Sequence, residues 1–170
     1  CYGRSDRKDQ PREPITARLV ADMIQVAGAD RYITMDLHAG QIQGFFSIPG
    51  DVLSGYHILK PFLLAKQAEM YNPVVLTADL GFAKNGRRYA QAMNIPLVLI
   101  EKRRIDNKEN AEALTLIGDL RDRDVILIDD EIDTGGSMVE AIQLAKLHGA
   151  REIYVIFIHP VLSADAAERL

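Results

Sequence analysis

The stretch Val125–Met138, VILIDDEIDTGGSM, decides the fold class of this 170-residue sequence. Its first four residues are apolar and rich in Val and Ile, which is typical of a fully buried strand. An acidic pair, Asp129 and Asp130, follows directly. Two glycines and Ser137 then lead into a segment with helical spacing. A buried strand, a polar loop and a helix in this order predict one unit of a parallel α/β sheet.

The rest of the sequence repeats this alternation of strands and helices. Apolar runs predict buried strands over residues 32–37, 74–79, 97–102, 125–130 and 153–159. Helical spacing predicts helices over residues 15–27, 58–70, 84–93 and 138–148. In such a pattern a parallel sheet is covered by helices on both faces, and ligands bind beyond the carboxyl ends of its strands. Polar residues stand at most of these ends: Asp36 with His38, Asp79, Lys102 with Arg104, and Asp129 with Asp130.

Composition narrows the function classes. Hydrophobic residues make up 48% and charged residues 26%, as in an ordinary globular domain with a buried core. A net charge of −4 gives no general basic surface for nucleic acid. No apolar run has the length of a membrane span, about 18 residues. The single cysteine, Cys1, fits a reducing cytosol and leaves no internal disulfide framework, so we expect a cytoplasmic location. Because the sequence opens in a polar stretch without Met, we expect it to be a piece of a longer chain.

The loop after the acidic pair carries the groups needed to bind one sugar phosphate. The carboxylates at the strand end can accept hydrogen bonds from two sugar hydroxyls. The adjacent glycines let successive N–H groups turn inward, and the helix N-terminus adds free amides for a phosphate dianion. An ordinary capped turn accounts for the glycines and the serine but not for the acidic pair. The residues predicted to bind ribose 5-phosphate are Asp129, Asp130, Asp133, Thr134, Gly135, Gly136 and Ser137.

Three other stretches have a less regular pattern. Residues 3–12 and 103–110 are polar and taken alone indicate solvated loops. Residues 48–56 contain Pro and two Gly and are the predicted domain boundary.

Gly81–Arg88, GFAKNGRR, follows a strand and partly matches the phosphate loop of NTPases. That loop requires Lys followed by Ser or Thr, and here Arg87 and Arg88 stand in their place, so we reject this interpretation.

With these residues in hand, the sequence resembles the ribose-phosphate diphosphokinase (PRPP synthetase) family. The segment IDDEIDTGGS resembles the PRPP-binding motif shared with type I phosphoribosyltransferases. Tyr2–Thr16, YGRSDRKDQPREPIT, resembles the ATP-binding flag region of the synthetases. Ile33–Phe46, ITMDLHAGQIQGFF, is very close to their MDLHA-x-QIQGFF stretch, and Leu99–Asn107, LIEKRRIDN, resembles their K-x-R catalytic loop. These stretches occur in family order and at family spacing.

The resemblance implies a fold and a reaction. The fold is a parallel-sheet α/β type I phosphoribosyltransferase-like fold, with two tandem related domains in the full-length family. Residues 1–55 correspond to the C-terminal part of the first domain, and residues 56–170 to the second, which carries the PRPP-binding loop. The implied enzyme makes PRPP and AMP from ATP and ribose 5-phosphate with Mg²⁺, for nucleotide biosynthesis. A homo-oligomer is implied as well, and Gln41 and Gln43 match a region of subunit and regulatory contacts.

Each matching stretch also implies roles for particular residues. They are Lys102 and Arg104 for catalysis, Arg4, Asp9 and His38 for ATP, Asp79 and Gly81 for the diphosphate, and His38, Asp79 and Asp129 for the metal. Cations suit this chemistry because charge spreads over the phosphoryl oxygens in the transition state. The polar stretch 103–110 would then be a loop that closes over the reacting groups.

The sequence departs from the family pattern in the diphosphate loop, which usually reads S-P-D-x-G-G-x-x-R. Residues 77–85 read TADLGFAKN, so Phe82 replaces the second glycine and Asn85 the arginine. We expect a Cβ and a ring where backbone should approach the diphosphate, and the loss of a bidentate donor. Glu131 also replaces an apolar family residue. Two alternatives stay open: a catalytically weakened regulatory subunit associated with PRPP synthetase, and a plain type I phosphoribosyltransferase.

Overall fold

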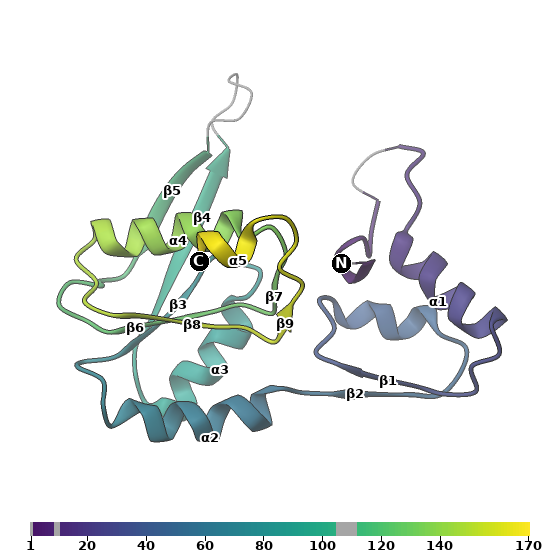
Figure 1. The fold of residues 1–170 in the computed structure, drawn as a ribbon, viewed down its shortest axis with the longest axis horizontal. Coiled ribbons are helices and arrows are strands. Elements are labelled where there is room, and N and C mark those ends of the chain that lie inside the picture. The colour runs from purple at the N-terminus through teal and green to yellow at the C-terminus, as the bar shows by residue number, and fades with distance from the viewer. Residues whose placement is uncertain (1, 9–10, 105–111) are drawn as a thin grey trace. The chain divides into compact units, whose positions relative to one another are not determined.

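The computed structural model describes residues 2–8, 11–104 and 112–170 (Figure 1). The chain divides into two compact units, Cys1–His57 and Ile58–Leu170. The first unit contains a two-stranded sheet, and the second contains a five-stranded sheet with a separate pair of short strands. Among the described residues, none of the helices combines the length and the apolar character needed to cross a bilayer.

The first unit is built on two parallel strands. Its elements are η1 Tyr2–Arg4, α1 Thr16–Val26, β1 Tyr32–Met35, η2 Gly40–Phe45 and β2 Gly50–Leu53. The register runs from Tyr32 opposite Gly50 to Met35 opposite Leu53. The Tyr32 ring stacks on Phe46 with centroids 4.0 Å apart. It also crosses Gly50, where an added Cβ would lie 2.0 Å from the ring, so only glycine fits there.

The second unit holds the main sheet. Its elements, the first of which begins in the first unit, are α2 Tyr56–Gln67, β3 Val74–Thr77, α3 Ala83–Met93, β4 Leu97–Arg104, β5 Glu112–Ile117, β6 Val125–Ile128, β7 Glu131–Ile132, α4 Gly136–Leu147, β8 Ile153–Ile156, β9 His159–Pro160 and α5 Ala166–Arg169. The main sheet has the strand order β5-β4-β3-β6-β8, and β7 pairs with β9. Strand β3 is parallel to β4 and β6, and β6 is parallel to β8.

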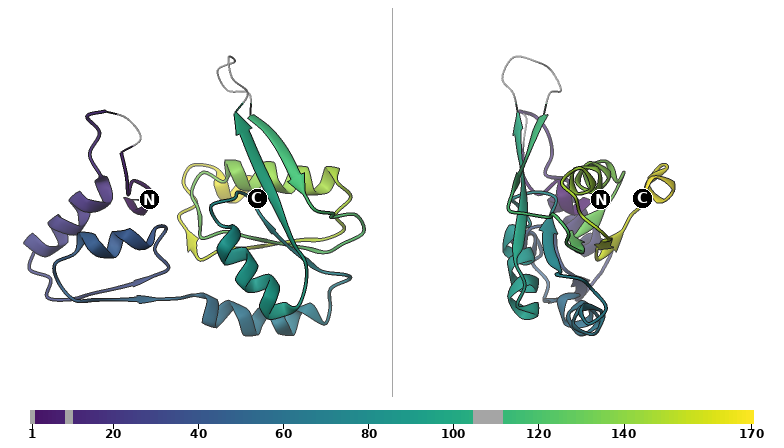
Figure 2. Two further views of the ribbon diagram at one scale, coloured as in Figure 1. Left: turned by 180° about the vertical axis from the view of Figure 1, so that it is seen from behind. Right: turned by 90° about the vertical axis from the view of Figure 1, so that its left-hand side faces the viewer.

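The centre of this sheet is buried on both faces. Every residue of β3 and of β6 is buried, as the continuous apolar runs predict. One face packs against α4, whose buried residues Met138, Ala141 and Ala145 join Leu76 and Leu127 in the main core. On the other face α3 approaches so closely that a Cβ at Gly86 would lie 2.3 Å from the Thr77 side chain. Helix α4 thus lies on one side of β6 and β8, and α2 and α3 on the other (Figures 1 and 2).

The structure differs from the predicted parallel sheet at two strands. Strand β5, which was not predicted, is antiparallel to β4, with Leu99 opposite Ile117 and Arg104 opposite Glu112. Strand β1 does not join the main sheet but pairs with β2, which lies inside the predicted boundary stretch 48–56. Both missed strands follow stretches with turn residues or charge, and neither is a continuous run of apolar residues.

One predicted loop boundary is wrong for a local reason, whereas the first helix agrees with its prediction. The predicted loop 103–110 starts too early, because β4 continues to Arg104 in its pairing with β5. The rest of that loop lies outside the described residues. Helix α1, Thr16–Val26, agrees with the predicted range 15–27 to within one residue at each end, and Gly28 just beyond it has a φ of 96°.

Candidate functional site

An acidic cluster stands at the carboxyl edge of the main sheet. Thr77 of β3 is in register with Ile128 of β6, so the residues that follow both strands emerge at the same edge. Burial raises the pKa of Asp129 to about 7, and a side-chain hydrogen bond with Asp130 and the charges of Asp130 and Asp79 act in the same direction. The predicted acidic residues are therefore brought together, close enough for their charges to interact.

The glycine loop follows this cluster and opens helix α4. Gly135 is buried and has the left-handed conformation, with a φ of 76°. Gly136 already belongs to the helix and has no positive φ, so the backbone requires glycine only at Gly135. The hydroxyl-bearing residues Thr134 and Ser137 are exposed. The first N–H groups of a helix have no partners within it, and here they stand beside those hydroxyls, an arrangement that suits a phosphate group.

Lys102 joins this loop from strand β4. Beyond Leu99, which pairs with Thr77, the strand continues with β5 as a hairpin past the ends of the other strands (Figure 2). Three more residues carry Lys102 about 10 Å further along the strand. Its ammonium donates to the Ser137 hydroxyl at 3.2 Å and to a Glu140 carboxylate oxygen at 3.1 Å.

Two neighbours of Lys102 complete this part of the site. Glu140 was not singled out from the sequence, although its position three residues after Ser137 places it on the same face of α4. The backbone of Arg104 continues β4, while its side chain lies outside what the structure describes.

The diphosphate loop between β3 and α3 has a compact, closed shape. A carboxylate oxygen of Asp79 accepts the Phe82 N–H at 2.9 Å. A Cβ at Gly81 would lie 3.0 Å from the same oxygen, which explains the glycine. The Phe82 side chain is only 9% exposed and belongs to the core. The ring that the sequence places in the diphosphate loop is therefore mostly buried and does not project into solvent. Asn85 and Lys84, in the first turn of α3, are exposed.

In the first unit, Arg4 and His38 lie on neighbouring segments. A Cβ on Gly3 would be 3.9 Å from the Cβ of His38, so the residue beside Arg4 contacts the histidine's segment. Both Arg4 and His38 are exposed. Asp9, the third residue predicted at this place, lies outside the described residues.

Hydrogen bonds hold these segments of the first unit in place. The Ala17 N–H donates to the Ser5 carbonyl at 3.1 Å, and the Gln41 amide donates to the Asp6 carboxylate. Asp36 has a φ of 37°. Its carboxylate accepts hydrogen bonds from the Ser54 hydroxyl at 2.9 Å and from the Gly55 backbone N–H. The turn that presents His38 is thus fixed by Asp36.

The predicted metal ligands fall into two groups. Asp79 and Asp129 are together at the sheet edge, whereas His38 belongs to the other unit. In the described part of the chain, no group of three or more His, Cys, Asp or Glu residues has the geometry to hold a metal ion. Two carboxylates fit Mg²⁺, which usually takes only one or two protein carboxylates and completes its shell with water and substrate phosphates.

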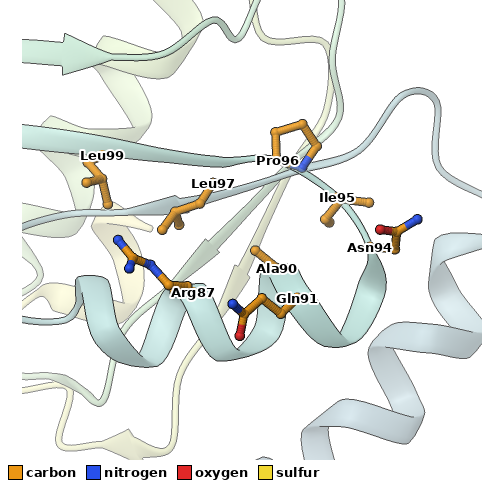
Figure 3. Close-up of a pocket in the computed structure, with 8 residues that line it drawn as sticks. All are labelled: Arg87, Ala90, Gln91, Asn94, Ile95, Pro96, Leu97 and Leu99. Carbon is orange, nitrogen blue, oxygen red and sulfur yellow. The ribbon is translucent and has the colours of Figure 1, made fainter.

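A hollow of about 540 Å³ lies along α3 and the start of β4 (Figure 3). Leu97 and Leu99 line it from the strand, and Arg87 and Gln91 from the helix. Because it uses the first residues of β4, it lies away from Lys102 at the other end of that strand. It is therefore separate from the acidic cluster and the glycine loop.

Comparison with known proteins identifies the family. The phosphoribosyl transferase domain matches residues 64–169. The chain belongs to this family. The N-terminal domain of ribose phosphate pyrophosphokinase matches residues 1–28. The predicted phosphoribosyltransferase-like fold is confirmed, and residues 64–169 contain the acidic cluster, the glycine loop and Lys102.

Individual relatives of the chain have a more specific name than the domain family. The chain is 44% identical over 169 residues to the ribose-phosphate pyrophosphokinase of Wolinella succinogenes, and the match covers 99% of the chain and 54% of the relative. The ribose-phosphate pyrophosphokinase of Caldanaerobacter subterraneus subsp. tengcongensis is 48% identical over 170 residues, and the match covers 99% of the chain and 53% of the relative. The predicted resemblance to the ribose-phosphate diphosphokinase (PRPP synthetase) family is therefore confirmed. The chain spans about half the length of the curated relatives it matches.

A solved structure gives the same result for the fold. The crystal structure of phosphoribosylpyrophosphate synthetase from Mycobacterium smegmatis matches with a TM-score of 0.89 and 37% identity, over 99% of this chain and 54% of that one. The match covers both units of the chain, so the elements of the first unit are also found in that structure.

Proposed function

We propose that the whole protein is a ribose-phosphate diphosphokinase, which makes PRPP and AMP from ATP and ribose 5-phosphate. The observation that carries this proposal is the 3.2 Å hydrogen bond between the Lys102 ammonium and the Ser137 hydroxyl. It places a strand-borne cation beside a glycine loop that suits a sugar phosphate. The names of the relatives support the same reaction.

Ribose 5-phosphate binds at the start of helix α4. The 5-phosphate accepts hydrogen bonds from the amides and hydroxyls of the Asp133–Ser137 loop, because the N–H groups of a helix N-terminus and its dipole favour a bound anion. Asp129 and Asp130 accept hydrogen bonds from the ribose hydroxyls at the end of β6. Since the pKa of Asp129 is raised to about 7, its carboxylate gains from a hydroxyl or cation partner that offsets its burial and the neighbouring charges.

Diphosphoryl transfer takes place beside Lys102. The anomeric hydroxyl oxygen of ribose 5-phosphate attacks the β-phosphorus of ATP, and the bond from that phosphorus to the α-phosphate's bridging oxygen breaks. AMP leaves with this oxygen, and the hydroxyl proton is released. Lys102, with Arg104, supplies positive charge to the phosphoryl oxygens, where negative charge spreads in the transition state. Asp79 and Gly81 shape the loop that receives the diphosphate.

ATP and the metal use the remaining predicted residues. Arg4, Asp9 and His38 bind ATP, and the proximity of the Arg4 and His38 segments supports this assignment for two of the three. Asp79 and Asp129 would hold Mg²⁺ at the edge of the main sheet, where the ion would neutralise phosphate charge. His38, in the first unit, is also proposed as a metal ligand. Carboxylate oxygens are the hard ligands that this ion prefers.

The organisation of the whole protein follows the same proposal. Residues 1–55 form the C-terminal part of a first phosphoribosyltransferase-like domain, and residues 56–170 form a second. The protein assembles as a homo-oligomer in the cytoplasm. The match of the first 28 residues to the N-terminal domain of ribose phosphate pyrophosphokinase supports the two-domain arrangement.

A regulatory subunit is the second candidate, and one observation favours it. Asn85 is exposed in the first turn of α3, where the family pattern has an arginine that binds diphosphate. Phe82, in contrast, no longer supports this candidate, because its ring is buried. A plain type I phosphoribosyltransferase is disfavoured by the match of residues 1–28 to a pyrophosphokinase domain.

Release of AMP tests the proposal. The whole protein is mixed with ATP and Mg²⁺, with or without ribose 5-phosphate, and AMP is measured by chromatography. We expect AMP only when the sugar phosphate is present, and at a much lower rate in Lys102→Met. Binding of ribose 5-phosphate without AMP release would favour the regulatory subunit, and PRPP consumption with a free base would favour the phosphoribosyltransferase.

A further inference from the structure

The last twelve residues, 159–170, which we call the C-terminal arm, run along the glycine loop (Figure 1). The arm begins with β9, which pairs in parallel with β7, so that Ile132 lies opposite Pro160. Beyond this pair, the Leu162 N–H donates to the Ile132 carbonyl at 3.0 Å, and the Ser163 N–H donates to the Asp133 carbonyl at 3.1 Å. The arm thus stays bonded to the loop up to Asp133.

Two side chains of the arm reach the loop itself. The Ser163 hydroxyl donates to the Asp133 carboxylate at 2.5 Å. The guanidinium of Arg169 donates to the Thr134 carbonyl at 3.3 Å and lies 3.7 Å from the Asp165 carboxylate. Consecutive loop residues are therefore held by different parts of the arm.

Apolar contact closes the back of the loop. Gly135 is buried, and a Cβ added to it would lie 3.5 Å from the Cβ of Ala166. Ala166 itself is 0% exposed, and a Leu170 side-chain carbon would be 3.8 Å from that added Cβ. Gly135, which has the left-handed backbone conformation before helix α4, is thus packed directly against the arm.

The hydrogen bond to Asp133 matters for the binding of an anion. An aspartate in a phosphate-binding loop is a rival anion, because its carboxylate can accept the same amide hydrogens as the ligand. The Ser163 hydroxyl engages this carboxylate and gives it a fixed partner outside those amides. Such a charge-assisted hydrogen bond is stronger than a neutral one.

We propose that Ser163 and Arg169 are positioning residues that set the affinity for ribose 5-phosphate by fixing the shape of the Asp133–Ser137 loop. Neither residue touches the ligand. Both act through the loop, Ser163 on the Asp133 carboxylate and Arg169 on the Thr134 carbonyl. The inference rests on the proposed phosphate site and deepens it.

Binding of ribose 5-phosphate to the whole protein, measured by titration calorimetry, tests this without any need for turnover. In Ser163→Ala we expect affinity to fall about tenfold, the size of one lost hydrogen bond to a charged group. In Arg169→Gln, which removes a longer, solvent-exposed hydrogen bond to the Thr134 carbonyl, we expect a fall of about threefold. Ser163→Thr keeps the hydroxyl and restores affinity. Glu168→Gln, an exposed neighbour on the same short helix, is the matched control and binds like the wild type.

The kinetic constants separate positioning from general damage. We expect the KM for ribose 5-phosphate to rise in Ser163→Ala while the KM for ATP stays constant. Melting temperatures show whether each variant is folded, and the exposed Arg169 provides a test that does not depend on core packing.

Two results would overturn the inference: unchanged ribose 5-phosphate affinity in both Ser163→Ala and Arg169→Gln, or equal losses in Glu168→Gln. A wild-type protein that does not bind ribose 5-phosphate would also overturn it. If the wild type binds the sugar phosphate and the variants weaken it, but no AMP is released, the inference stands and only the proposed reaction fails.

Discussion

The ammonium of Lys102 and the carboxylate of Glu140 form an ion pair with a separation of 3.1 Å. The two side chains are 25% and 52% exposed, so water screens the pair and its stabilisation of the fold is at most about 1 kcal/mol. The same ammonium donates to Ser137 in the glycine loop. Glu140 thus competes with a bound phosphate for the ammonium at the proposed phosphate site, so the main effect of the pair concerns ligand binding.

Replacing Glu140 by Gln removes a negative charge from the helix that opens the phosphate site. We expect ribose 5-phosphate to bind about two- to fivefold more tightly at low salt, with a smaller gain at 1 M salt because exposed charges are then screened. Calorimetry at two salt concentrations measures this. Glu152→Gln, at an exposed carboxylate elsewhere in the second unit, serves as the control. Weaker binding in Glu140→Gln would show that the pair is needed to hold Lys102 in place.

Replacing Lys102 by Met tests the catalytic role of the cation. We expect kcat to fall by about 10²- to 10³-fold, as for the loss of one preorganised group that stabilises transition-state charge. The affinity for ribose 5-phosphate should change much less, since the loop amides remain. Steady-state kinetics and calorimetry on the same variant provide both values. An unchanged kcat would remove Lys102 from the catalytic site.

The two unusual residues of the diphosphate loop should behave differently on reversion to the family pattern. Phe82→Gly empties a buried position, so we expect the free energy of unfolding to fall by about 3 to 5 kcal/mol. Asn85→Arg changes an exposed residue, so stability should stay constant while affinity for inorganic diphosphate rises. Denaturant unfolding and calorimetry measure these effects. If Phe82→Gly proved neutral for stability, the ring would not be part of the core.

Stability should depend on pH through Asp129. Its pKa is raised from 3.8 to about 7 in the folded state, mainly by burial. The folded state therefore binds a proton that the unfolded state lacks, and this favours folding most below pH 4. The contribution is lost as the pH rises towards 7 and stays absent above it.

Asp129→Asn isolates that contribution. We expect its stability relative to the wild type to improve as the pH rises from 5 to 8, because the variant has no charge to bury. Urea unfolding at several pH values measures the difference, and Glu152→Gln shows the slope of an exposed carboxylate. A difference that does not change with pH would mean that Asp129 titrates normally.

Much of the second unit could be predicted from its sequence. The apolar runs that form β3 and β6 are buried on both faces, and such runs have little choice of structure. The polar residues at their ends, Asp79 and Asp129, follow from the rule that parallel strands end at one edge. The glycine loop could also be predicted from its residue types. Gly135 has the left-handed backbone conformation that glycine adopts without strain.

The contacts between distant segments could not be predicted. Glu140 pairs with Lys102 only because β4 extends past the sheet edge with β5. Ser163 reaches Asp133 because β9 pairs with β7, and two-residue strands leave no sequence pattern. The buried position of Phe82 depends on the turn capped by Asp79, which residue types alone do not fix.

The most direct test of the account is a ³¹P NMR analysis of the products formed by the whole protein from ATP and ribose 5-phosphate with Mg²⁺. The account predicts equal amounts of AMP and of a diphosphate ester on the sugar, formed by wild type and reduced strongly in Lys102→Met. ATP hydrolysed to ADP, or ATP and sugar phosphate both unchanged while ribose 5-phosphate is bound, would contradict it.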